Sequence, residues 1–283
     1  MRNRALLVPL LALTLLAVGC GRLTDAGDGG GIEHPTGPNE LVLRMDIGGG
    51  FVPVEYALAQ FPQWSLFGDG RLITEGPQIE IYPGPALPSL QVQTLTDDGV
   101  QAILKAARES GLMGPDRSHD YPCIADAPTT TFTVYADGAR HVVSAYALGI
   151  GEGACQGADT EARAKLVAFQ ATLTDLQSWL PAGSVSDQLP FEFDEMRVVV
   201  QPYSASPEPG LEQNPIDWPL EPLSAFGLPD PTFSDFRCGV VSGADFAKLL
   251  PDAQRANELT PWRSDGERYG LIFRPLLPDE HTC

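Results

Sequence analysis

Apolar and polar residues alternate over short runs in the first half of the chain, a pattern that predicts β-strands joined by tight turns. Residues 41–45 and 78–82 each predict a strand, the second ending at Pro83. Two predicted hairpins follow the same rule, with residues 64–67 and 72–74 around Gly68-Asp69-Gly70, and residues 129–135 and 140–146 around Asp137-Gly138.

Two segments of this half instead show helical spacing. Thr96 is a plausible N-cap, followed by the acidic Asp97 and Asp98, and Gly111 or Gly114 ends the helix. Its apolar face consists of Val100, Ile103, Leu104 and Ala107. A longer helix is predicted from about Asp159 to Trp179, with Pro181 stopping it. Its buried seam is Leu166, Phe169, Leu173, Leu176 and Leu180.

The second half opens with a β-rich run over residues 191–200, before a proline-rich stretch over residues 202–231. That stretch has no periodicity and is longer than a structural loop needs, so we expect a functional or mobile loop. Ser242 and Asp245 have the spacing of a capping box that opens a short helix. Its core face is Phe246, Leu249 and Leu250, and Trp262 and Tyr269 face each other across Asp265-Gly266.

These elements predict an α+β fold of two small domains, each an antiparallel sheet packed by one or two helices. The 26 prolines and 29 glycines, well spread, favour strands and turns over a helical bundle. The expected division is a signal peptide (1–19), a Gly/Pro-rich tether (20–40), a first domain (41–182), a linker (183–190) and a smaller second domain (191–283).

The N-terminal residues combine a positive start with a short apolar stretch. Arg2 and Arg4 precede the apolar residues 5–17, which are too short for an ordinary membrane span. The following Leu16-Ala17-Val18-Gly19-Cys20 resembles the lipobox of bacterial lipoproteins, with Ala17 where that pattern usually has leucine. The resemblance implies lipidation of Cys20 after cleavage. The alternative is an ordinary signal peptide with an incidental cysteine. A glycine-rich run after Cys20 is typical of a flexible tether.

Five cysteines are present, and lipidation of Cys20 leaves four, an even number that favours two disulfides outside the cytoplasm. Four cysteines allow three pairings. Extending the Asp137-Gly138 hairpin ladder brings Cys123 close to Cys155, so we predict Cys123–Cys155 and, by remainder, Cys238–Cys283. Each bridge stabilises by roughly 3–4 kcal/mol in the chain-entropy model.

The formal charge of −19 excludes nucleic-acid partners, because these require Lys and Arg contacts. The same acidity favours solubility in an exported protein, with attraction of cations or a basic partner as the alternative. No later stretch has the unbroken apolar length of a second membrane anchor.

Candidate chemistry is sparse. No nucleophile elbow, P-loop, zinc-helix or dinucleotide pattern occurs, and no Cys-x-x-Cys pair or EF-hand loop predicts a metal, so no cofactor is expected. His119 with Asp116 and Asp120 has the residue types of a base and its carboxylate, but without a nucleophile we interpret it as part of an exposed loop. His34, His141 and His281 are interpreted as structural or inert.

The segment 274–280, Arg-Pro-Leu-Leu-Pro-Asp-Glu, is stiff because prolines flank the two leucines. Leu276 and Leu277 either present a docking patch or fill the core beneath the Cys238–Cys283 bridge. Buried leucine is the norm, so we favour the core.

Two patterns together resemble known bacterial proteins. The first half resembles a small secreted α+β domain to which no activity is assigned. The resemblance is carried by the order of its elements: a strand, the Gly68-Asp69-Gly70 turn, a strand, a helix from Leu95-Thr96, the stretch Asp126-Ala127-Pro128-Thr129-Thr130-Thr131 and an Asp-Gly hairpin. The C-terminal residues Trp262, Tyr269, 274–280 and Cys283 resemble a lipoprotein type of high-GC bacteria. The resemblance implies a fold and a location, and no catalytic residue.

Two functions follow as hypotheses. The first is a non-catalytic binding or interaction module, lipid-anchored on the extracytoplasmic side of a bacterial cell membrane, with an extracellular protein as partner. The second is a carboxylate-dependent hydrolase of cell-wall polymer or glycan, which needs one acid with a raised pKa. A groove lined by Trp64, Trp218 or Trp262 would favour the hydrolase.

Overall fold

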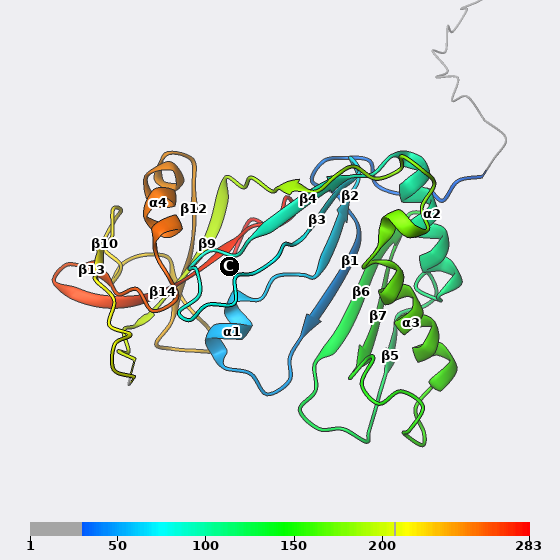
Figure 1. Ribbon diagram of the computed structural model, residues 1–283, viewed down its shortest axis with the longest axis horizontal. Helices are drawn as coiled ribbons and strands as arrows, with labels where there is room; N and C mark the ends of the chain where they lie inside the picture. The colour runs from blue at the N-terminus through cyan, green and yellow to red at the C-terminus, as the bar shows by residue number, and fades with distance from the viewer. Residues whose placement is uncertain (1–29, 207) are drawn as a thin grey trace, which may run out of the picture. The chain divides into compact units, whose positions relative to one another are not determined.

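In the computed structural model, which describes residues 30–206 and 208–283, the first half of the chain forms an eight-stranded sheet (Figure 1). The strand order is β5-β7-β6-β1-β2-β3-β4-β8, and every pairing is antiparallel except β5 with β7. The strands are β1 (Leu41–Gly48), β2 (Trp64–Phe67), β3 (Arg71–Glu75), β4 (Leu90–Thr94), β5 (Arg117–His119), β6 (Thr129–Ala136), β7 (Ala139–Tyr146) and β8 (Leu189–Pro190). A short helix, α1 (Val54–Ala59), follows β1.

Both hairpins predicted for this half are confirmed. Asp137 and Gly138 have positive φ, and the ladder pairs Ala136 with Ala139 and Phe132 with Val143. The strand predicted over residues 78–82 is wrong. Its alternating residues pair with no strand in the described part of the chain, and Ile79 and Ile81 are exposed.

Two helices cover the β1, β6 and β7 part of this sheet (Figure 1). α2 (Asp97–Glu109) begins as predicted, since the Thr96 side chain accepts a hydrogen bond from the Gly99 N–H. α3 (Thr160–Thr172) is shorter than predicted, and a separate 3-10 turn, η1 (Leu176–Ser178), follows it. At the end of α3, side chains donate to the backbone carbonyls that further helix N–H groups would otherwise use. The Thr172 hydroxyl donates to Phe169 O, and the indole of Trp179 donates to Thr172 O. The predicted apolar seam of the helix is nevertheless buried throughout.

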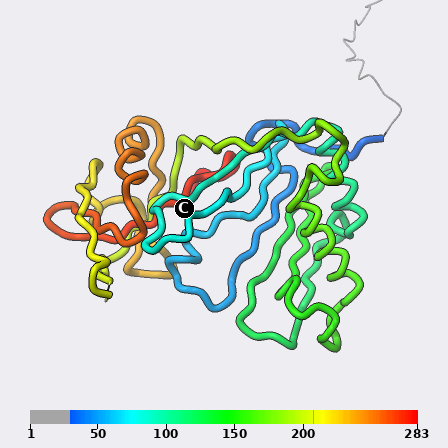
Figure 2. The backbone as a smooth tube through the Cα atoms, in the orientation of Figure 1, coloured from blue at the N-terminus to red at the C-terminus, as the bar shows by residue number. Residues whose placement is uncertain are grey.

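The second half forms a six-stranded sheet with the order β10-β13-β14-β9-β12-β11. The strands are β9 (Glu195–Pro202), β10 (Ile216–Asp217), β11 (Leu228–Pro229), β12 (Arg237–Ser242), β13 (Trp262–Ser264) and β14 (Glu267–Pro275). The Trp262–Tyr269 pair across Asp265-Gly266 is confirmed. The fold is therefore α+β with two sheets and few helices, as predicted (Figure 2).

One helix, α4 (Gly243–Arg255), packs on this sheet through Phe246 and Leu249. The predicted capping box is wrong, because the Ser242 side chain makes no cap hydrogen bond. Asp245 instead forms an ion pair with Lys248 at 2.9 Å.

The irregular stretch over residues 202–231 is anchored to the second core. Trp218, Leu223 and Phe226 are buried in it, and the Trp218 indole donates to Glu221 O. Trp218 also meets Phe226 and Trp262 edge-on, with ring centroids 5.5 and 5.9 Å apart. These contacts favour a structural role for the middle of the stretch.

Residues 32–283 group into one unit by their contacts, and the C-terminal residues join its two sheets. Leu277 packs with Phe61, Phe67 and Ile73 from the first half, and the Arg274 guanidinium donates to Gln60 O at 2.7 Å. Leu276 is also buried, so the predicted burial of both leucines is confirmed and the docking patch is wrong. The predicted place of Leu277, beneath the Cys238–Cys283 bridge, is corrected, because it packs with the first half.

Two segments expected to be connecting chain belong to the folded body. Ile32 is buried and hydrogen-bonds the Gln101 side chain, so the predicted tether covers at most the residues before Ile32. Within the predicted linker 183–190, β8 pairs with β4 and extends the first sheet by one short strand.

The disulfides Cys123–Cys155 and Cys238–Cys283 are both formed, which confirms the predicted pairing. The first closes a loop next to the buried Ala147 and Tyr121. The second ties the C-terminal residue to β12. Cys20, the predicted lipidation site, lies outside the described residues.

Candidate functional site

A groove of about 580 Å³ lies on the helix-bearing face of the first sheet, beside the end of α3. We name it the polar groove. Its floor is made of buried apolar side chains from β1, β2, β3 and the turn after α3: Met45, Trp64, Leu72, Leu173 and Leu176. Its walls and rim are polar, and contain no Lys, Arg or His.

Three carboxylates line the polar groove: Glu75, Asp175 and Asp187. None of them forms an ion pair with another residue of the described ranges 30–206 and 208–283. Desolvation raises the pKa of Glu75 above its ordinary value, although part of the side chain remains exposed. The groove is therefore a site of uncompensated negative charge.

Amide side chains complete the wall. Gln63, Gln177 and Gln188 make no side-chain hydrogen bond to any part of the chain that the structure describes, whereas Gln93 donates to Ser186 O at 2.9 Å. Ser186 also accepts from the Thr94 N–H, and these two bonds hold residues 184–188 along β4. This arrangement brings Asp187 and Gln188 to the groove.

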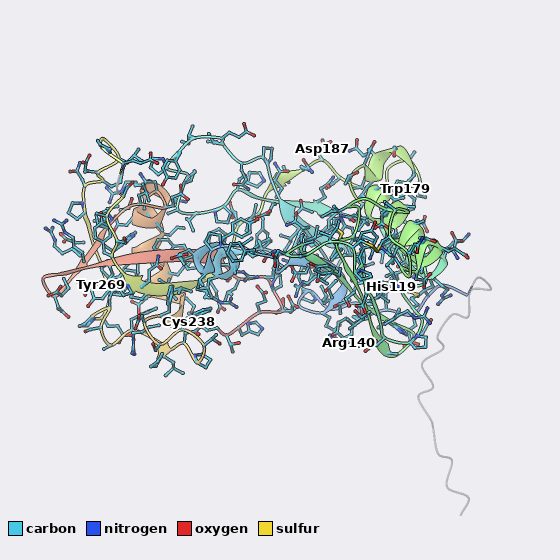
Figure 3. All side chains as sticks on the ribbon, turned by 90° about the horizontal axis from the view of Figure 1, so that it is seen from below. His119, Arg140, Trp179, Asp187, Cys238 and Tyr269 are labelled. Carbon is cyan, nitrogen blue, oxygen red and sulfur yellow. A yellow bond between two sulfur atoms is a disulfide. The ribbon has the colours of Figure 1, made fainter. Side chains whose placement is uncertain are left out.

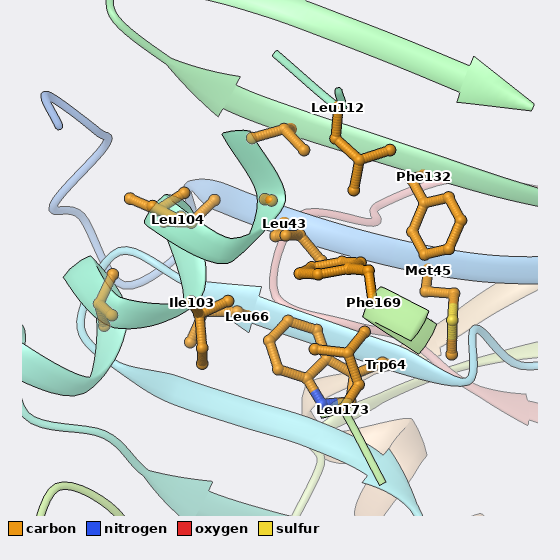
Figure 4. Packing of buried hydrophobic residues seen from close by; sticks show 14 of the residues in the cluster. Leu43, Met45, Trp64, Leu66, Ile103, Leu104, Leu112, Phe132, Phe169 and Leu173 are labelled. Carbon is orange, nitrogen blue, oxygen red and sulfur yellow. The ribbon is translucent and has the colours of Figure 1, made fainter. Parts of the chain in front are cut away.

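The indole of Trp64 forms part of the floor, beside Leu173 (Figure 4). Trp64 is 3% exposed, and its Nε1–H has no hydrogen-bond acceptor among the described residues. A buried donor without an acceptor is costly, so this N–H is an unsatisfied polar group beneath the floor of the groove.

Exposed tryptophan rings, which we expected of a glycan-cleaving groove, are not found at the three predicted positions. Trp218 is 7% and Trp262 1% exposed, and both belong to the second core. Trp64 lines the polar groove but is itself buried. No ring face at these positions is open to stack on a sugar.

A second cavity of about 400 Å³ contains His119. The exposed-loop interpretation of this histidine is wrong, because it is 6% exposed and ends β5, which pairs in parallel with β7. Its Nδ1 lies 3.7 Å from the Asp159 carboxylate, while Asp116 accepts from the Val142 N–H. Figure 3 shows His119 well apart from Asp187, so the two cavities are separate.

Desolvation lowers the pKa of His119 below its ordinary value, and the opposing charge of Asp159 does not restore it. The unfolded chain, with a histidine pKa of about 6.5, therefore binds a proton more readily than the folded chain. We expect the free energy of unfolding to fall as the pH drops below that value, and His119→Gln to remove this part of the loss.

Urea unfolding of the wild type and His119→Gln at pH about 7.5 and about 5 measures the effect. The wild type should lose more stability between the two pH values than the variant. Equal losses in both proteins would show that His119 protonates as easily in the folded chain as in the unfolded one.

The remaining histidines have structural contacts. His141 pairs with Val134 in the hairpin ladder, as predicted, and its Nδ1 lies 2.9 Å from Gly114 O. His34 and His281 lie near Asp97 and Glu195 at 3.6 and 3.9 Å. Among the residues described, no group of three or more His, Cys, Asp or Glu is placed to hold a metal ion.

No helix in residues 30–206 and 208–283 has the length and apolar character needed to cross a membrane. No family model matches the chain, and no curated protein or solved structure matches it either. The resemblance to a secreted domain and to a lipoprotein type therefore depends on the sequence motifs alone.

Proposed function

We propose that this protein is a non-catalytic binding module, held by a lipid on Cys20 at the extracytoplasmic side of a bacterial cell membrane, and that its ligand binds in the polar groove. The signal-peptide pattern ending at Cys20 supports the anchor and the location. The two disulfides support an oxidising compartment.

The unpartnered polar side chains of the groove carry the proposal of binding. Three carboxylates and three amides line one concave surface without pairing with one another. All but the half-buried Gln63 are exposed, so water satisfies them when no ligand is bound. Gathered in a groove of this volume around an apolar floor, they have the composition of a small-ligand site.

Hydrolysis of wall polymer or glycan is the second candidate, because the raised pKa of Glu75 is one property of a general acid. A general acid of this kind is held in an apolar pocket, whereas Glu75 lies at an exposed rim. Binding without catalysis therefore explains the groove better.

Replacing two groove amides tests the binding site. Full-length chain, purified in detergent and immobilised, is exposed to envelope extract of the native cells. We expect Gln177→Ala/Gln188→Ala to reduce the retained ligand about tenfold, since each hydrogen bond contributes ~0.5–1.5 kcal/mol. The matched control is Gln156→Ala/Gln254→Ala, which changes two exposed glutamines elsewhere.

Equal retention by the two double variants would exclude the polar groove as the binding site. Release of soluble wall fragments from the extract by the wild type, lost in Glu75→Gln, would replace the binding module with the hydrolase. The anchor is tested separately by labelling cells with radioactive palmitate. Label should appear on the wild type and be absent from Cys20→Ser.

A further inference from the structure

The His119 imidazole is buried, yet it has no hydrogen-bond partner among the described residues. The side chain is 6% exposed, and its Nδ1 lies 3.7 Å from the Asp159 carboxylate, beyond hydrogen-bond distance. Within the described ranges, the unpaired side-chain atoms that are sealed from the surface are Trp64 Nε1 and Arg197 Nε. The ring nitrogens of His119 are unpaired without being sealed, so they are open to the cavity of about 400 Å³ that this residue lines. A buried polar group of this kind takes its partner from water or from a ligand.

This cavity, which we name the His119 cavity, lies between β5 and the start of α3. Arg117 and His119 are two residues apart in β5, so their side chains point to the same face of the sheet, about 7 Å apart along the strand. Asp159, Glu161 and Lys165 line the wall that α3 provides. The cavity therefore combines the imidazole with charges of both signs.

One charge of each sign is left without a permanent partner. Lys165 pairs with Glu161 at 2.9 Å. Arg117, in contrast, forms no ion pair with any residue that the structure describes. Asp159 caps α3, and of the basic groups described, the His119 ring alone lies within ion-pair distance of it. Burial lowers the pKa of His119, so the ring is neutral at pH 7 and does not balance Asp159.

The unpaired groups restrict the class of ligand. A purely anionic ligand would be repelled by Asp159, and a purely cationic one by Arg117. In the neutral imidazole, a proton on Nδ1, which faces Asp159, leaves Nε2 as an acceptor that needs a donor. A molecule that carries both an anionic group and a cationic donor satisfies all three residues.

We infer that the His119 cavity binds a free α-amino acid as its zwitterion. Arg117 pairs with the ligand carboxylate, and the ligand ammonium group donates to Asp159 and to Nε2 of His119. Because Arg117 and His119 are near neighbours on one strand, the two ligand charges must also be close together. A free amino acid has this arrangement, whereas the termini of an extended peptide do not. The site is separate from the polar groove, as the positions of His119 and Asp187 show (Figure 3), so it goes beyond the proposed function.

An NMR titration of the full chain in detergent tests the inference through the Cε1–H resonance of His119, which His119→Gln assigns. The probes are L-alanine, L-leucine and L-glutamine, which share the charged groups and differ in the side chain. We expect at least one of them to shift the resonance and to saturate below about 1 mM. Absence of saturation by all three up to about 10 mM would overturn the inference and leave water as the occupant.

Two charge variants locate the bound amino acid. Arg117→Gln should weaken binding of the tightest probe at least about tenfold. Asp159→Asn, which keeps an N-cap acceptor on α3, should weaken it by a similar factor. The control Arg268→Gln/Asp98→Asn removes one charge of each sign from exposed positions elsewhere and should bind like the wild type. Wild-type affinity in both cavity variants would contradict the assigned contacts.

Matched analogues of the tightest probe separate its two charges. One analogue lacks the α-amino group, one lacks the carboxylate, and one has a hydroxyl in place of the ammonium group. Each should bind at least about tenfold more weakly than the amino acid. Failure of this site is distinguishable from failure of the proposed function, because Gln177→Ala/Gln188→Ala changes the polar groove and leaves the His119 cavity intact. Any analogue that binds as tightly as the amino acid would exclude recognition of the zwitterion.

Discussion

Replacing Arg163 with methionine should lower the free energy of unfolding by about 1.5–3 kcal/mol, the usual cost of losing hydrogen bonds made by a charged group, since Glu152 is partly exposed. Arg163 lies in α3 and is completely buried. Its guanidinium donates to Glu152 at 2.5 and 3.0 Å. It also donates to the carbonyls of Tyr146 and Ala147 at 2.8 and 2.9 Å.

These contacts connect three parts of the first half. Arg163 joins α3 to the end of β7 and to the loop that contains Cys155, and its guanidinium stacks 4.5 Å from the Tyr121 ring centroid. Methionine fills much of the volume but removes every N–H that the guanidinium donates. The Glu152 carboxylate still accepts from the Gly149 N–H and Ala147 O from the Ile150 N–H, so the loss is that of the charged donor.

Unfolding in guanidinium chloride at neutral pH, with the disulfides kept oxidised, measures this loss of stability. Lys165→Met, two residues along the same helix, is the control, because its exposed pair with Glu161 contributes at most ~0.5 kcal/mol. A change for Arg163→Met no larger than that of the control would mean that water replaces the guanidinium and that the site is not sealed.

Local sequence signals predicted the turns, the α2 helix and the disulfides well. The Asp-Gly pairs at 137–138 and 265–266 need positive φ, so they determined both the turn and the register of their strands. That register in turn placed Cys123 near Cys155, which is why a disulfide was predictable without tertiary information.

Features that depend on distant segments were not predictable in the same way. His119 is buried because β5 pairs with β7 across more than twenty residues, and nothing near His119 signals that partner. The polar groove gathers residues from β3, the turn after α3 and the segment 183–190. The last two segments lie only a few residues apart, but β3 is far from both in the sequence, so no spacing rule could have brought them together.

The C-terminal segment shows the same limit on a larger scale. The sequence placed Leu276 and Leu277 in a core and tied Cys283 to its own half, and both features are present. What the pattern could not indicate is that Leu277 packs with the first half and that Arg44 of β1 pairs with Asp279 at 2.7 Å. The two sheets are therefore coupled through the last residues of the chain.

That coupling makes Glu280 a sensitive position. Arg274 is buried and binds the Glu280 carboxylate through two nitrogens at 2.7 and 2.9 Å, and the Leu277 N–H donates to the same carboxylate. Burial by itself would raise the pKa of Glu280. The hydrogen bonds and charge of Arg274, with the Leu277 N–H and the charge of Arg44, outweigh burial and lower it.

We expect Glu280→Gln to lower the free energy of unfolding by about 3–5 kcal/mol at neutral pH, because the Arg274 charge is left buried without its partner. In the wild type, the contribution of this pair is present above the unfolded glutamate pKa of about 4.3 and is lost as the pH falls through the lower folded value. The stability of the variant should therefore depend less on pH in the acid range.

Denaturant unfolding of both proteins from neutral to acid pH measures the two effects together, with Glu267→Gln as an exposed control. The difference between wild type and Glu280→Gln should shrink as the pH falls. Arg274→Met/Glu280→Met should recover much of the loss, because it removes both buried charges. A difference that stays constant across the pH range would mean that the carboxylate contributes through its shape and packing, and that its charge does not hold the two sheets together.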